Sequence, residues 1–169
     1  MKRLTLVRHC QVRLEDCRIE GLRSAAEPPG PEGAPGMAQR LAEQKAHVDL
    51  LITSPAVRAL DNGALLRQGA RLPLRQLKSE DRLYLARPAE ILDVIRGVGT
   101  RVQHLAIFGH NPGLSEFAQQ ITAEPELGEL PTCAVYSMEF EIDKWSEARF
   151  GAARNASLGQ PRNFLDLLS

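Results

Sequence analysis

The chain has 169 residues, 43% of them hydrophobic and 25% charged, which predicts one folded domain covering residues 1–169 and excludes a wholly disordered chain. Its 21 basic and 21 acidic side chains balance, whereas a general nucleic-acid or acidic-membrane binder normally carries a basic excess. The three cysteines form no C-x-x-C pair, so we expect a reducing compartment and no disulfide framework.

The sequence shows no signal for a membrane span or for export. No apolar run approaches the roughly 18 residues that cross a bilayer. After the basic N-terminus, the apolar stretch Leu4–Val7 is followed at once by Arg8 and His9, whereas an export signal needs about 7–15 apolar residues. We therefore expect a cytoplasmic protein that binds neither membranes nor nucleic acid.

The first part of the chain predicts a strand, a loop and a helix. The apolar run Leu4–Val7 predicts the first strand. Residues 24–36 hold four of the eleven prolines and predict a loop, which is either solvated or overhangs a site and helps to choose the substrate. Apolar residues at helical spacing predict a helix over residues 34–47.

The middle of the chain predicts two strands separated by a helix. Val48–Thr53 predicts the second strand. Ser54-Pro55 is typical of a helix start, with the serine as cap and the proline as first helical residue, and this helix would run to about Gly69. Leu72–Leu77 predicts a third strand, which its proline would place at the edge of a sheet.

The second half continues the alternation. A helix is predicted to begin at Pro88, and His104–Phe108 predicts the fourth strand. Asn111-Pro112 repeats the pattern of a cap followed by proline at the first helical position. Residues from Ala134 to Ile142 alternate between apolar and polar, which predicts a strand with one buried face. Strands separated by helices predict a three-layer α/β fold with a mostly parallel central sheet.

Charged residues follow three of the predicted strands. Arg8 and His9 end the first strand, Arg58 lies in the first turn of the helix after the second, and His110 follows the fourth. In an open parallel sheet, ligands bind outside the carboxyl ends of the strands. We therefore expect these four side chains to converge on one pocket.

Two arginines and two histidines suit an anion, and phosphate in particular. The planar guanidinium of arginine matches phosphate oxygens and stays charged at any working pH. A histidine with one neutral nitrogen can attack phosphorus, and a second, protonated histidine can stabilise the charge on the transferring group. The set predicts metal-free phosphoryl transfer through a phosphohistidine intermediate, with no cofactor.

Several segments spread over nearly the whole chain carry a family resemblance: Leu6-Val7-Arg8-His9, Ser54-Pro55-Ala56-Val57-Arg58-Ala59, Arg82-Leu83-Tyr84, Pro88-x-Glu90-Ile91-Leu92, Gly109-His110-Asn111-Pro112-Gly113-Leu114, Leu130-Pro131-Thr132 and Trp145. Together they resemble the histidine phosphatase superfamily, and within it the SixA-type phosphohistidine phosphatases. The resemblance implies a phosphoglycerate mutase-like fold. It also implies that His9 is the nucleophile and that Arg8, Arg58 and His110 bind the phosphoryl group.

The sequence departs from the family pattern in three places. After the motif that contains Arg58 it continues Leu60-Asp61-Asn62-Gly63, where the family usually has Gln-Thr-Ala. Cys10 stands where the family usually has alanine or glycine after the Arg-His pair. The first loop, residues 24–36, lacks the arginine that the family usually carries there. The departures leave the four core residues intact.

A general acid is expected in the segment before Tyr84. Asp81 aligns slightly better than Glu80 with the acid of mutase-type relatives, although either carboxylate could instead cap a helix or face solvent. The chemistry also allows no acid at all, because the nitrogen of a phosphoramidate is easily protonated before cleavage.

Three other functions are less well supported by the residues. A cysteine-dependent phosphatase needs an arginine six residues after its cysteine, but Asp16 stands there after Cys10, and Cys17, with Arg23 at that offset, has no apolar strand before it. A metallohydrolase is disfavoured because the four histidines show no metal-ligand spacing. A phosphate-binding regulatory module with weak or lost turnover remains an alternative.

The expected partner is a phosphorylated protein. No second basic cluster offers a site for a large polyanionic ligand, and a chain this short should leave its site open at the surface. Such a site suits the phosphohistidine of a histidine phosphotransfer domain, to which the family resemblance also points. A small phosphate ester is the alternative substrate.

Overall fold

The computed structural model describes residues 1–8, 48–55, 76–131 and 134–159. These ranges leave out the predicted helix over residues 34–47, all but the first residue of the helix predicted over 55–69, the predicted loop 24–36, and the residues His9, Cys10 and Arg58.

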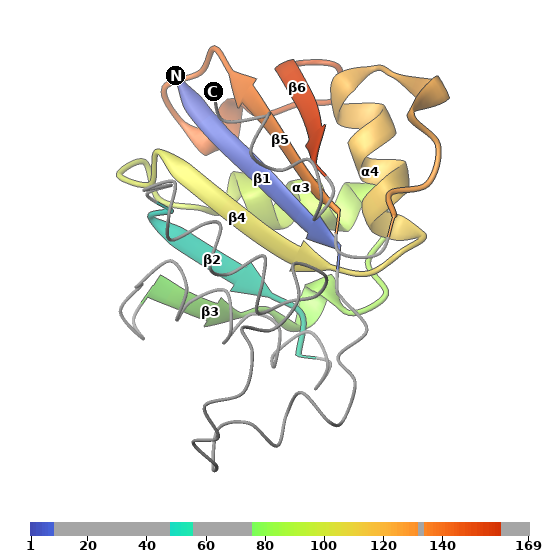
Figure 1. Ribbon diagram of the computed structural model, residues 1–169. Coiled ribbons are helices and arrows are strands. Elements are labelled where there is room, and N and C mark those ends of the chain that lie inside the picture. The colour runs from blue at the N-terminus through green and yellow to red at the C-terminus, as the bar shows by residue number, and fades with distance from the viewer. Residues whose placement is uncertain (9–47, 56–75, 132–133, 160–169) are drawn as a thin grey trace, which may run out of the picture.

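The described residues form a sheet of six strands in the order β3-β2-β4-β1-β5-β6 (Figure 1). The neighbours among β1 to β4 pair in parallel, whereas β5 is antiparallel to β1 and β6 is antiparallel to β5. The prediction of an α/β fold with a mostly parallel sheet is therefore confirmed. The strands are β1 (Lys2–Arg8), β2 (Leu50–Thr53), β3 (Leu77–Ser79), β4 (His104–Gly109), β5 (Val135–Phe140) and β6 (Arg154–Gly159).

Two helices, α3 (Pro88–Arg96) and α4 (Gly113–Thr122), pack against each other and cover one face of the sheet. Figure 1 shows α3 behind the central strands, with α4 beside it. Alternate residues of the strands form one apolar cluster with the inner faces of these helices, and the members with no exposed surface include Leu4, Leu6, Leu105, Ile107, Ile95, Phe117 and Ile121.

The opposite face of the central strands is also apolar and buried. Val7, Leu51 and Phe108, which alternate with the residues of the first cluster, are each at most 2% exposed. Burial on both faces is the pattern of parallel strands enclosed between two layers. It agrees with the predicted three-layer arrangement.

The predicted third strand is placed differently from expectation. It was expected over Leu72–Leu77, but β3 begins at Leu77, and the residues before 76 lie outside the described part of the chain. The predicted edge position is correct, since β3 is the outermost strand beside β2. The sixth strand was not predicted, because Arg154–Gly159 has only two alternating apolar residues, Ala156 and Leu158, and its pairing with β5 holds it in the sheet.

The start of α4 corrects one expectation. The helix begins at Gly113, with Pro112 in the N-cap position, rather than at a proline capped by Asn111. The Asn111–Pro112 peptide bond is cis. A Cβ atom on Gly113 would lie 1.8 Å from the carbonyl oxygen of Ala86, so only glycine lets the helix approach that segment. Among the described residues, no helix has the length and apolar character needed to cross a bilayer.

Candidate active site

The three strands that carry the expected site residues end side by side. Arg8 at the end of β1 lies opposite Gly109 of β4, and Thr53 of β2 lies opposite Phe108 of β4. The backbone N–H of Ser54 donates to the carbonyl oxygen of Phe108 at 3.3 Å, which continues the register past β2. Parallel pairing in this register therefore brings the segments that follow β1, β2 and β4 to the same edge of the sheet.

Two of the predicted residues follow this edge beyond the described ranges. His9 comes directly after Arg8, and Arg58 comes four positions after Ser54. Arg8 and Pro55 are the last described residues before them, so the positions of His9 and Arg58 lie outside the described structure and their predicted roles stay predictions.

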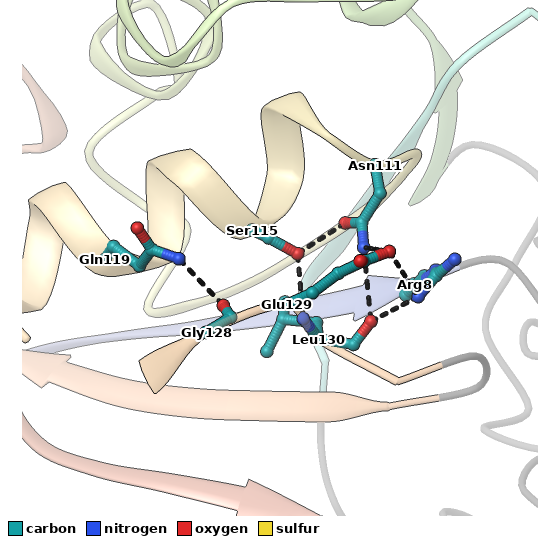
Figure 2. Close-up of polar contacts among 7 residues, drawn as sticks. All are labelled: Arg8, Asn111, Ser115, Gln119, Gly128, Glu129 and Leu130. Atoms are coloured by element: carbon teal, nitrogen blue, oxygen red, sulfur yellow. Dashed lines mark hydrogen bonds and ion pairs between the residues drawn. The ribbon is translucent and has the colours of Figure 1, made fainter. Parts of the chain in front are cut away.

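Arg8 is the best-defined charged group at this edge. Its backbone N–H donates to the carbonyl oxygen of Ala134 at 3.0 Å, and its side chain is 25% exposed. The Nη1 atom donates to the carbonyl oxygen of Leu130 and lies 3.3 Å from Oε1 of Glu129 (Figure 2). Both contacts use the same terminal nitrogen, which leaves the N–H groups of Nη2 and Nε to other partners.

A set of polar side chains from α4 and the turn before it surrounds this contact. Asn111 donates from Nδ2 to the Leu130 carbonyl at 3.2 Å and to Glu129 Oε1 at 3.1 Å. Ser115 donates its hydroxyl to Asn111 Oδ1 at 2.6 Å and accepts the N–H of Leu130 at 2.8 Å. Asn111 therefore serves as a link to the segment at 129–130, not as a helix cap.

His110 follows β4 directly, as expected. Its backbone carbonyl accepts the N–H of Leu114 at 3.0 Å, which ties the residue to the first turn of α4. The residue is partly exposed as a whole, but its Nε2 atom is buried. Its position between the end of β4 and α4 puts it at the same edge as Arg8, since β4 and β1 are neighbours.

The two candidate acids lie farther along this edge. A 3-10 turn, η3 (Asp81–Leu83), follows β3, and the N–H of Glu80 donates to the carbonyl oxygen of Thr53 at 2.9 Å. With β2 between β3 and β4, this segment starts about 10 Å from β4 at the usual strand spacing.

The carboxylates of Glu80 and Asp81 have different surroundings. Glu80 accepts from Nε of Arg82 at 3.0 Å and from its Nη2 at 3.2 Å. The side-chain hydrogen bonds from Arg82 lower the pKa of Glu80, so this group stays ionised and is a poor proton donor. Asp81 is exposed, and its side chain makes no hydrogen bond to another described residue. Glu80 is therefore committed to Arg82, whereas Asp81 is not held by a described side chain, and the role of Asp81 as general acid stays a prediction.

Sequence reasoning did not single out Ser115 or Glu129. The available signal was the four-residue spacing of Asn111 and Ser115, which puts two polar side chains on one helix face. No local pattern joins either residue to Arg8, which lies more than a hundred positions away in the sequence. Among the described residues, no group of three histidine, cysteine or acidic side chains lies close enough to hold a metal ion.

Comparisons with known proteins find the fold but no sequence family. No family model and no curated protein matches the sequence. The protein histidine phosphatase SixA, solved in complex with tungstate, superimposes with a TM-score of 0.69 and 16% identity, over 95% of this chain and 98% of that one.

A protein from Agrobacterium tumefaciens assigned as a phosphohistidine phosphatase SixA gives a TM-score of 0.62 with 21% identity, over 82% of this chain and 92% of that one. Phosphoglycerate mutase from Plasmodium falciparum gives a TM-score of 0.59 with 14% identity, over 94% of this chain and 89% of that one. The chain therefore has the phosphoglycerate mutase-like fold that its motifs predicted.

Proposed function

We propose that the protein is a phosphatase of the histidine phosphatase type that transfers the phosphoryl group of a protein phosphohistidine to His9 and then to water. The observation that carries this proposal is the meeting of three strand ends. The segments Arg8-His9, Ser54-Pro55-Ala56-Val57-Arg58 and Gly109-His110-Asn111-Pro112 all leave the same edge of the sheet, from β1, β2 and β4. The fold shared with SixA and phosphoglycerate mutase supports it.

The first step transfers the phosphoryl group to the enzyme. Arg8 and Arg58 bind the phosphoryl oxygens, and the neutral ring nitrogen of His9 attacks phosphorus in line with the leaving group. The bond between phosphorus and the substrate nitrogen breaks as the new bond to His9 forms. The protonated His110 stabilises the charge on the equatorial oxygens, so no metal ion is needed.

The second step returns the enzyme to its starting state. Water attacks phosphorus and gives up a proton to solvent or to Asp81, the bond to His9 breaks, and inorganic phosphate leaves. The substrate imidazole released in the first step takes up a proton, either from Asp81 or from solvent. Because a phosphoramidate nitrogen accepts that proton readily, Asp81 contributes more to the cleavage of an alkyl ester than to that of a phosphohistidine.

A small phosphate ester is the second candidate substrate. One structural neighbour is named a phosphoglycerate mutase, so the fold alone does not decide between a phosphoprotein and a small ester. The zero net charge and the lack of a second basic cluster in the sequence favour a protein-borne phosphohistidine, with its single phosphoryl group, over a larger polyanion.

The test compares turnover of the purified protein on a phosphorylated histidine phosphotransfer domain with turnover on a panel of sugar and glycerate phosphates, with and without a strong chelator. We expect kcat/KM for the phosphoprotein to exceed every small ester at least tenfold and to survive chelation. A small ester that is better by the same margin would contradict the phosphoprotein substrate. Absence of turnover together with phosphate binding would favour a regulatory module.

A further inference from the structure

One face of α4 is joined to the backbone of residues 128–130 by a row of polar side chains. Asn111, Ser115 and Gln119 are spaced four residues apart, so they lie in line on one side of the helix and the turn before it (Figure 2). Gln119 donates to the carbonyl oxygen of Gly128 at 2.8 Å, and the other two contact Leu130. The row fixes this segment against the helix.

The directions of these hydrogen bonds are fully determined at Leu130. Its N–H donates to Oγ of Ser115, so the serine hydroxyl hydrogen must point elsewhere, and it is donated to Asn111 Oδ1. With Oδ1 used as an acceptor, the Nδ2 group of Asn111 faces the Leu130 carbonyl. Ser115 is only 4% exposed, so water does not compete for these bonds.

The Leu130 carbonyl is shared between this network and Arg8. The same oxygen that accepts from Asn111 also accepts from Nη1 of Arg8. A guanidinium that is held at one nitrogen has less rotational freedom to lose when its other N–H groups bind an anion. In the described part of the chain Ser115 makes no hydrogen bond to Arg8; its hydroxyl bonds Asn111 and the N–H of Leu130, and these two residues meet at the carbonyl oxygen that Arg8 binds.

We propose that Ser115 and Asn111 are positioning residues for Arg8: they fix the backbone of Leu130, whose carbonyl orients the Arg8 guanidinium to receive the phosphoryl group. The proposal rests on the proposed function, because it assigns the phosphoryl group to Arg8. It separates these residues from Glu129, whose side chain is 69% exposed and contacts Arg8 through charge at 3.3 Å. An exposed pair of this kind adds little to orientation.

The experiment measures the dissociation constant of tungstate, a phosphate mimic, by calorimetry for Ser115→Ala in two backgrounds, the natural protein and Arg8→Ala. Thr122→Ala is the matched control, because Thr122 also loses a hydroxyl on α4, there bonded to the Ala118 carbonyl at 2.7 Å, but lies at the far end of the helix. Asn111→Ala is measured in the same two backgrounds, so the answer does not depend on the folding of one variant. Unfolding temperatures confirm that each protein is folded.

We expect Ser115→Ala to weaken tungstate binding about tenfold in the natural protein and less than threefold when Arg8 is already alanine, because its effect passes through Arg8. Thr122→Ala and Glu129→Gln should each change the constant less than threefold. Equal losses in the two backgrounds, no loss in either, or a loss for Glu129→Gln as large as for Ser115→Ala would overturn the positioning role. Failure of the unsubstituted protein to bind tungstate would instead overturn the proposed function, and this role with it.

Discussion

The two ends of β1 each carry a basic side chain that donates to backbone carbonyls, yet they differ in how many N–H donors remain available to a ligand. At the start of the strand, Lys2 is 1% exposed, and its Nζ donates to the carbonyl oxygens of Thr100 and Val102. At its end, Arg8 is 25% exposed and commits one nitrogen to the carbonyl oxygen of Leu130. The first cation closes a loop onto the sheet, whereas the second keeps donors for a ligand.

The difference follows from side-chain chemistry as well as from burial. An ammonium offers three donors from one atom, so two carbonyls and full burial nearly exhaust it. A guanidinium offers five donors on three nitrogens in a fixed plane, so one nitrogen can be anchored while the opposite edge stays matched to phosphate oxygens. Basic residues at both ends of one strand therefore serve the fold at one end and the proposed site at the other.

The largest effect is expected for His9, the residue that follows Arg8 in the sequence. His9→Ala should abolish turnover, because the proposed mechanism assigns the attack on phosphorus to His9 and gives that role to no other residue at the three strand ends. The unfolding temperature should stay close to that of the unsubstituted protein. A variant that keeps a near-normal kcat on the phosphohistidine protein would contradict the mechanism.

Substitutions of Arg8 and Lys2 test directly whether the two side chains have different roles. Arg8→Ala should lower kcat/KM by about 100-fold or more, since it removes a charged donor aimed at the phosphoryl oxygens. Lys2→Met should instead lower the free energy of unfolding by about 1–3 kcal/mol, because two carbonyls at a buried site lose their donor. Its kcat/KM should stay within threefold. Steady-state kinetics and urea unfolding of both variants measure these effects. A large loss of kcat/KM in Lys2→Met would contradict a purely structural role for Lys2.

Asp81 is the proposed proton donor to the leaving group. Asp81→Asn should lower kcat/KM for alkyl phosphate esters by about tenfold, and for the phosphohistidine protein by less than threefold, because only the ester needs an acid to leave. Glu80→Gln is the matched control and should change neither value appreciably. Equal losses on both substrates would show that Asp81 binds rather than protonates.

The close approach of α4 to Ala86 predicts an effect on stability. Gly113→Ala should lower the free energy of unfolding by about 1–3 kcal/mol, because the new Cβ would lie 1.8 Å from a carbonyl oxygen and the backbone must move. Gly99→Ala is the control, since a Cβ there meets no atom within 4 Å. Similar unfolding curves for the two variants would refute the packing argument.

The smallest effect concerns Glu80 and pH. Its pKa is lowered in the folded protein by the hydrogen bonds from Arg82, so the ionised carboxylate stabilises the fold above its unfolded pKa of about 4.3. That stability is lost as the pH falls through the lowered folded pKa. Glu80→Gln should cost less than about 1 kcal/mol at pH 7, because Arg82 is exposed, and the cost should shrink at pH 3. Urea unfolding at the two pH values measures it.

The sequence predicted the ends of β1, β2 and β4 well, because each of these strands is a short apolar run that stops at a charged or capping residue, whereas β3 (Leu77–Ser79) is not such a run and was misplaced. Arg8 and His110 stand at the edge where the patterns placed them. The same reasoning missed β6, because its two alternating apolar residues, Ala156 and Leu158, are too few to predict a strand, and pairing with β5 holds it in the sheet. It also misread Asn111 as a cap, because a local rule could not foresee that Leu130 would compete for its side chain.

The contacts that Arg8 makes with Leu130 could not be predicted from the sequence, for a physical reason. They join β1 to a segment about 120 residues away through a backbone carbonyl, and a carbonyl oxygen carries no signature of residue type. Only the four-residue spacing of Asn111 and Ser115 was visible, and it does not say what the pair contacts.

The most direct test of the central claim is to identify the atom that carries the phosphoryl group. A single turnover with a radiolabelled phosphohistidine protein, quenched in denaturant at high pH, should leave label on the enzyme. Peptide mapping should place that label on His9, in a linkage stable to base and labile to acid. Label on Cys10 or on Asp81, or turnover with no labelled enzyme at any time point, would contradict a phosphohistidine intermediate.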